Sequence, residues 1–213
     1  MNKKLVALAS FLLVGALLAG CGGTRASHYY QLSALRNEPR PDGNPVRYPV
    51  TLLVTSFQTS HLYREDRIVY GSKGEEMGLY QYERWTEPPS EMLRDIILRN
   101  LRNSGRFKEV HSLRSSARGD FILRGHLYDL KEMDMDKVLV ARVTFEAELM
   151  DTKTRNTVWT HAYTHDEPVA SKNVAAVVAA LDRNVQAGVA DLATSLEQYF
   201  AARPPEANST GEN

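Results

Sequence analysis

Cysteine is almost absent from this chain, and neither charge sign is in excess. The sequence contains one cysteine, Cys21, so no disulfide can form within the chain, and neither a thiolate zinc site nor a thiol nucleophile is expected in the folded domain. Basic and acidic residues are equally numerous, 26 of each. Without a surplus of positive charge there is no strong field to attract DNA or RNA, so we expect no nucleic-acid partner.

The chain also lacks an apolar stretch long enough to cross a membrane. Its most apolar run extends from Leu5 to Leu18, which is shorter than the about 20 residues of a spanning helix but suits the apolar core of a signal peptide. Lys3 and Lys4 precede this run and supply the positive start that such peptides have. Residues 1–20 are therefore predicted to be a signal peptide.

A lipid attachment site is predicted where the signal peptide ends. The string Leu18-Ala19-Gly20-Cys21 resembles a lipobox, in which the cysteine sulfur is diacylated and the chain is cut before it. Two or three acyl chains hold a soluble domain on a membrane almost permanently, whereas a single chain binds reversibly. The alternative is an ordinary secretory signal with a chance cysteine. By the sorting rule of Gram-negative lipoproteins, Gly22 in place of Asp predicts the outer membrane, with the domain facing the periplasm.

Motifs that carry catalysis or bind metal are missing. His161 and His165 would share one face of a helix, but in a strand they lie about 13 Å apart, too far to share a metal. His126 joins them as a residue expected on a solvated face of neighbouring strands. The sequence has no His-Glu-x-x-His and no Gly-x-Ser-x-Gly, and Gly71–Gly74 lacks the phosphate-loop spacing. We expect no catalytic residue, no metal and no cofactor, and therefore not an enzyme.

The mature chain divides into three parts by composition. Residues 21–28 are mostly small and polar and are predicted to be a tether, and residues 29–201 to be one domain. Residues 202–213 are rich in Pro, Glu and Ser and are predicted to be disordered. Within the domain, Tyr29–Leu32 is a candidate first strand and Val50–Val54 a buried central strand.

A hairpin followed by a short helix is predicted next. Arg67–Tyr70 and Leu79–Tyr82 are strand-like segments on either side of a polar tip. The helix that follows has apolar residues at three- and four-residue spacing and ends at Asn103–Gly105. Either Thr86 or Glu87 is expected to cap its start.

The second half of the chain predicts an antiparallel meander and a long helix. Asp120–Leu130, Val138–Met150 and Thr157–Asp166 alternate as strands, and Ser171–Phe200 repeats apolar residues at helical spacing. The expected fold is α+β, a mostly antiparallel sheet with one short helix and one long C-terminal helix packed on it.

Several stretches resemble those of a known family. Tyr82–Pro89, closing on Ser104–Phe107, is similar to the central signature of the ABC-type transport auxiliary lipoproteins, the PqiC-like family. Tyr29–Leu32 matches the Tyr-Tyr-x-Leu strand that begins the family's domain, and Phe121–Gly125 and Asp151–Trp159 resemble its paired strands. The resemblance spans roughly residues 29 to 200, nearly the whole mature chain.

The resemblance implies a periplasmic accessory subunit of an ABC system that moves phospholipid or related lipids between the two membranes. Its partners would be an MCE-domain protein with its permease and ATPase, and a homo-oligomer would suit a subunit that caps a conduit. Two alternatives remain: a structural outer-membrane assembly lipoprotein that partners a β-barrel, and a periplasmic envelope hydrolase.

The candidate site is the hairpin and the start of the short helix. Tyrosines on the hairpin would offer aromatic contact area to a partner, a composition favoured at interfaces. Trp85 has two interpretations, as a packing anchor between hairpin and helix or as an interface contact. The predicted family-motif and interface residues are Tyr70, Tyr80, Tyr82, Trp85, Pro88 and Pro89.

Overall fold

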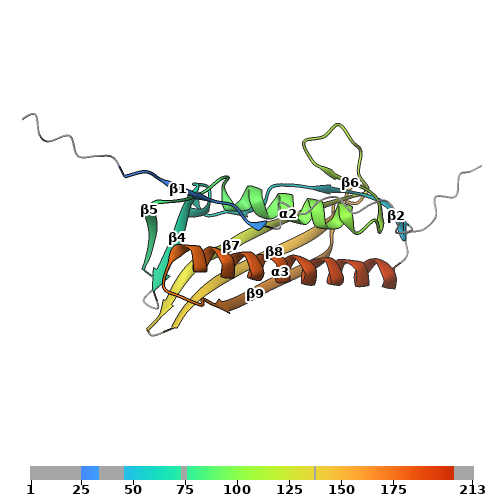
Figure 1. Ribbon diagram of the computed structural model, residues 1–213. Helices are drawn as coiled ribbons and strands as arrows, with labels where there is room; N and C mark the ends of the chain where they lie inside the picture. The colour runs from blue at the N-terminus through green and yellow to red at the C-terminus, as the bar shows by residue number, and fades with distance from the viewer. Residues whose placement is uncertain (1–24, 34–45, 73–75, 137, 204–213) are drawn as a thin grey trace, which may run out of the picture.

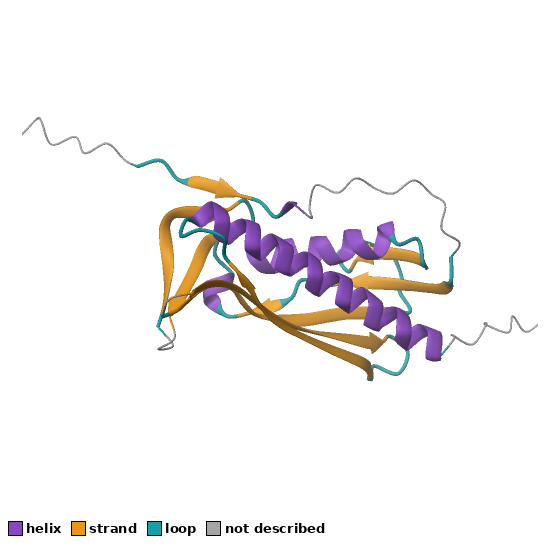
Figure 2. Cartoon of the chain, turned by 60° about the horizontal axis from the view of Figure 1, so that its bottom comes forward, coloured by secondary structure: helices purple, strands orange, loops and turns teal. Residues whose placement is uncertain are grey.

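A curved sheet carries two helices on one face in the computed structural model (Figures 1 and 2). The structure describes residues 25–33, 46–72, 76–136 and 138–203. The predicted signal peptide, Cys21 and residues 204–213 of the predicted tail lie outside these ranges. Within them, no helix is both long enough and apolar enough to span a membrane.

The described residues form nine strands, two α-helices and a short 3-10 turn. The strands are β1 (His28–Tyr30), β2 (Tyr48–Val54), β3 (Gln58–Thr59), β4 (Arg67–Ser72), β5 (Met77–Trp85), β6 (Phe107–Ser112), β7 (Phe121–Met135), β8 (Val138–Asp151) and β9 (Thr157–Pro168). The turn is η2 (His61–Tyr63) and the helices are α2 (Pro89–Asn103) and α3 (Val174–Ala202).

The predicted meander and the α+β class are confirmed. Strands β7, β8 and β9 pair antiparallel over most of their length. Along β8 the side chains alternate: Val143, Phe145 and Ala147 are buried, while Thr144 and Glu146 between them are partly exposed. The buried set faces α3, so the two faces of the sheet differ sharply in polarity.

Parallel pairing completes the sheet and was not foreseen. Strand β2 pairs in parallel with both β6 and β7, β3 and β4 pair in parallel with β7, and β1 pairs in parallel with β5. Parallel neighbours need a long connection between them, and hairpin β4–β5 together with α2 forms that connection between β2 and β6. The long ladders nevertheless remain antiparallel.

The start of α2 corrects the predicted cap. The cap position is Pro88, not Thr86 or Glu87, and its side chain makes no capping hydrogen bond. Pro88 is extended because a residue that precedes a proline is pushed out of the helical region, and Pro89 then begins the helix. The predicted stop is correct: Gly105 has a φ of 63°, which glycine adopts without strain.

Helix α3 lies close to the sheet because residue 188 is glycine. A Cβ atom built on Gly188 would lie 2.7 Å from Tyr163 Cε1 and 2.9 Å from Phe145 Cε1. Those two rings stack with centroids 5.3 Å apart on β9 and β8. Any side chain at position 188 would push the helix away from this aromatic pair.

Asn184, one turn earlier on α3, joins the helix to two strands. The side chain is 1% exposed, and its Nδ2 donates to the carbonyl oxygens of Ala141 and His165, each at 2.8 Å. The Tyr163 hydroxyl donates to Asn184 Oδ1 at 2.8 Å. Every polar atom of this buried amide is therefore used, as burial demands.

Replacing Asn184 by leucine should destabilise the protein strongly. Asn184→Leu keeps most of the volume but removes three buried hydrogen bonds, so we expect the free energy of unfolding to fall by about 2–4 kcal/mol. Urea denaturation measures this. The matched control is Thr194→Val on the exposed side of the same helix, which should change stability by less than about 0.5 kcal/mol. Equal losses in the two variants would contradict the role given to Asn184.

Candidate functional site

Hairpin β4–β5 carries an exposed tyrosine ring that packs against two neighbours. Tyr70 stands opposite Gly78 in the antiparallel register, and its ring covers that glycine so closely that a Cβ there would lie 2.4 Å from Tyr70 Cζ. The Tyr80 ring meets it edge-on with centroids 5.0 Å apart. Despite these contacts, Tyr70 is 43% exposed. We call Tyr70 and Tyr80 the tyrosine pair.

Tyr80 is fixed in turn by a carboxyl group on β7. Its hydroxyl donates to Glu132 Oε2 at 2.9 Å. Burial raises the pKa of Glu132, an effect that the Tyr80 hydrogen bond partly offsets and the nearby Asp134 charge reinforces. Burial and the same contact raise the pKa of Tyr80 well above its ordinary value, so the phenol stays a donor at neutral pH.

The other predicted residues of the site do not join this pair. Trp85 is fully buried, and Pro89 is buried at the start of α2. Trp85 belongs to the same core cluster as Ile68 of β4 and Met92 of α2, so the structure places it as a packing residue between hairpin and helix. Pro88, half-buried, sits at the helix cap.

Tyr82 lies further along β5 and contacts a different residue, Arg25. It is half-buried, and the guanidinium carbon of Arg25 lies 5.3 Å from its ring centroid. This distance suits a cation–π contact. The predicted interface tyrosines therefore divide into the tyrosine pair near the hairpin tip and Tyr82 beside the start of the described chain.

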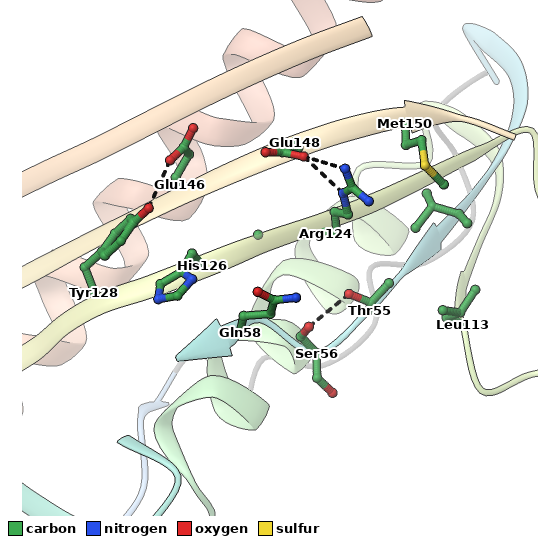
Figure 3. Close-up of a pocket in the computed structure, with 12 residues that line it drawn as sticks. Thr55, Ser56, Gln58, Leu113, Arg124, His126, Tyr128, Glu146, Glu148 and Met150 are labelled. Carbon is green, nitrogen blue, oxygen red and sulfur yellow. Dashed lines mark hydrogen bonds and ion pairs between the residues drawn. The ribbon is translucent and has the colours of Figure 1, made fainter. Parts of the chain in front are cut away.

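A groove on the outer face of the sheet is a second candidate (Figure 3). It is an open hollow of about 560 Å³ between β7, β8 and the segment that links β2 to β3. The side chains that define its floor are Arg124, His126, Tyr128, Glu146, Glu148 and Met150. Of these residues, only His126 was a candidate from the sequence. The others come near it only through the register that sets Arg124 opposite Glu148 and His126 opposite Glu146.

The polar groups of this groove are largely satisfied by one another. Arg124 donates to Glu148 Oε2 at 3.0 and 2.9 Å, and the Tyr128 hydroxyl donates to Glu146 Oε2 at 3.2 Å. The His126 ring stacks on Tyr128 with centroids 4.3 Å apart. This arrangement gives a rigid polar surface rather than converging nucleophile, acid and base. In the part of the chain that the structure describes, no group of three or more His, Cys, Asp or Glu side chains could hold a metal.

The three histidines do not share a face as predicted. His161 and His165 pair with Ala147 and Val143 on the side of the sheet that α3 covers, whereas His126 lies in the groove on the other side. His161 Nε2 is 3.0 Å from the carboxylate of Asp191 on α3. The expectation failed because the sequence does not reveal how β7 and β9 are aligned on β8.

Sequence comparison identifies a family. The profile of the ABC-type transport auxiliary lipoprotein components matches residues 30–193. No curated protein sequence matches the chain.

Solved structures share the fold. Protein XCC0632 from Xanthomonas campestris, of the family DUF330, superimposes with a TM-score of 0.71 at 19% identity, over 83% of this chain and 99% of that one. An uncharacterized protein superimposes with a TM-score of 0.62 at 14% identity, over 81% of this chain and 99% of that one. At such low identity, these likenesses concern the architecture alone.

Truncating Trp85 should cost stability. Trp85→Ala leaves a large cavity between hairpin and α2, and we expect a loss of about 3–5 kcal/mol in the free energy of unfolding. Thermal melting followed by circular dichroism checks this. Val138→Ala is the control, because Val138 is 56% exposed. An unchanged melting temperature with lost partner binding would instead make Trp85 an interface residue.

Glu132 should make stability depend on pH in a defined direction. Its pKa is raised in the folded state, so the native protein holds this proton more tightly than the unfolded chain, and stability is lost as pH rises through the folded pKa. Glu132→Gln keeps an acceptor for Tyr80 without the charge. We expect the variant to gain stability over the parent above the ordinary glutamate value of 4.5, but not well below it. Urea titrations at several pH values measure this, with exposed Glu87→Gln as control. A gain confined to acidic pH would refute the assignment.

Proposed function

Because the chain belongs to the family of ABC-type transport auxiliary lipoprotein components, we propose that it is a non-catalytic docking subunit of an ABC system that moves lipid between the inner and outer membranes. The partner it meets would be an MCE-domain protein, together with the permease and the ATPase. The chain itself would supply no ATP site, because its glycine-containing hairpin tip lacks the phosphate-loop spacing.

Anchoring places the domain where it can meet such a partner. Acyl chains on Cys21 would hold it on a membrane, and Gly22 supports the outer membrane with the domain facing the periplasm. A homo-oligomer would suit a subunit that caps a conduit, and this remains part of the proposal.

The observation that carries the docking role is the tyrosine pair. Tyr70 is a large aromatic side chain that is 43% exposed yet held in place by Gly78 beneath it and Tyr80 beside it. A partner that buries this ring would gain apolar contact without first ordering it, and such preorganised aromatic residues dominate binding energies. The groove supports this role less, because its donors and carboxylates are already paired.

Removing the Tyr70 ring should weaken partner binding without unfolding the domain. The acylated protein is extracted in detergent, and the proteins that remain bound are identified by mass spectrometry. We expect the MCE-domain protein with its permease and ATPase, and at least about tenfold less of it with Tyr70→Ala. Tyr128→Ala is the control, because Tyr128 is similarly exposed, at 48%, but lies outside the hairpin.

Three results would contradict the proposal. Recovery of an outer-membrane β-barrel protein alone would favour the assembly lipoprotein. Recovery of nothing, from cells shown to express the transporter genes, would remove the docking role. Turnover of peptidoglycan or lipid esters by the purified protein would instead favour the hydrolase.

A further inference from the structure

The chain that leads away from Cys21 is fastened to the domain almost as soon as the structure describes it. Arg25 lies over the Tyr82 ring. Three residues later, His28 Nδ1 is 3.1 Å from Glu83 Oε1, and the Tyr30 hydroxyl donates to Glu83 Oε2 at 2.9 Å. The segment assigned as a tether to residue 28 thus already contacts β5 from residue 25 onward.

The chain just after β1 is also held by α3. The backbone N–H of Ser33 donates to Asp182 Oδ1 at 2.8 Å, and Gln186 Nε2 donates to Ser33 Oγ at 3.2 Å. Leu32 between these contacts is fully buried. The fold, and not a free linker, therefore sets where the chain leaves the domain.

This attachment limits the distance between Arg25 and a membrane in which Cys21 is anchored by its acyl chains. Three residues lie between Cys21 and Arg25, so four Cα–Cα steps join them and their Cα atoms can be at most about 14 Å apart in a fully extended chain. The polar region on each side of a bilayer is itself about 5–8 Å thick. Arg25 must then lie within or just above the lipid headgroups, and β5 adjoins it through Tyr82.

The side chains on this surface suit that position. Tyr29 is 62% exposed and makes the largest exposed aromatic surface of the described chain, and tyrosine rings concentrate at the membrane–water boundary. Arg25 carries a guanidinium whose fork of donors matches phosphate oxygens.

The nearby carboxylates do not oppose this contact. Asp66 is paired with Arg84 at 2.6 Å, and Glu83 is held by His28 and Tyr30. Burial works against ionisation of Glu83, but the hydrogen bonds from His28 and Tyr30 lower its pKa overall. The Arg25 charge also helps to lower the Glu83 pKa. The Arg25 guanidinium lies over the Tyr82 ring, and its several N–H donors suit the oxygens of a phosphate.

We propose that Arg25, Tyr29 and Tyr82 form a bilayer-contact surface for phosphate-bearing lipid headgroups, which turns β1 and the part of β5 that pairs with it toward the membrane. The inference rests on the acylation of Cys21 proposed above. The loop that follows β6 lies at the other end of the molecule (Figure 1) and points into the periplasm in this orientation. Tyr82 then serves the membrane, while the tyrosine pair stays with the protein partner.

Tryptophan fluorescence of the protein in vesicles tests this orientation, and the native tryptophans should respond little to the lipid. The chain has two tryptophans, of which Trp85 is fully buried and Trp159 partly buried. The acylated Tyr29→Trp protein is reconstituted into vesicles of phosphatidylethanolamine and phosphatidylglycerol with and without brominated acyl chains. Leu113→Trp is the control, because Leu113 is 43% exposed in the loop after β6.

We expect the tryptophan at position 29 to shift to shorter emission wavelength and to be quenched several-fold more strongly than the one at position 113. Adding Arg25→Gln to Tyr29→Trp should reduce this quenching, whereas adding Arg64→Gln, an exposed arginine elsewhere, should not. Equal quenching at the two positions, or none at either in protein that floats with the vesicles, would overturn the contact surface and leave the anchor intact. Protein that does not float would refute the anchor, and this surface with it.

Discussion

The close approach of α3 to the inner face of β8 and β9 is the constraint on which the rest of the structure depends. Gly188 permits it, since a Cβ there would meet the Tyr163 ring at 2.7 Å. Distant parts of the chain then attach to the same helix. Ser33 bonds to Asp182 near one end, and the Tyr48 hydroxyl donates to the Glu197 carbonyl at 3.0 Å near the other. A methyl group at position 188 would push α3 away from the sheet, and this displacement would disturb both of these hydrogen bonds.

Two surfaces of the molecule differ in character: one end carries exposed aromatic residues, and the outer face of the sheet is polar. One end gathers β1 and hairpin β4–β5 (Figure 1), where the exposed Tyr70 ring lies over Gly78 and Trp85 is fully buried. The outer face of β7 and β8 is polar, and its charges are paired along the register. A surface that is exposed but internally ordered suits contact with a partner, because little entropy is lost when it binds.

The individual helices and strands could be predicted from the sequence better than the neighbours of each strand. The hairpin, the meander, both helices and the α+β class follow from local periods of two and 3.6 residues, and these are confirmed. The cap of α2 was misplaced, since Pro88 is extended ahead of Pro89 and takes that position itself. Of the candidate site, Tyr70 and Tyr80 do meet, but Trp85 is buried and Tyr82 lies beside Arg25. The groove escaped notice apart from His126.

The features that could be predicted from the sequence alone are therefore local. The alternation along β8, the long apolar repeat of α3 and the proline-led start of α2 each rest on residues close together in the chain, and so does the lipobox-like string that ends at Cys21. Only the tertiary structure decided that β2 lies in parallel between β6 and β7, that Arg124 faces Glu148, and that Arg25 rests on Tyr82. These contacts join segments tens of residues apart, and no local pattern specifies which strands become neighbours or in what register.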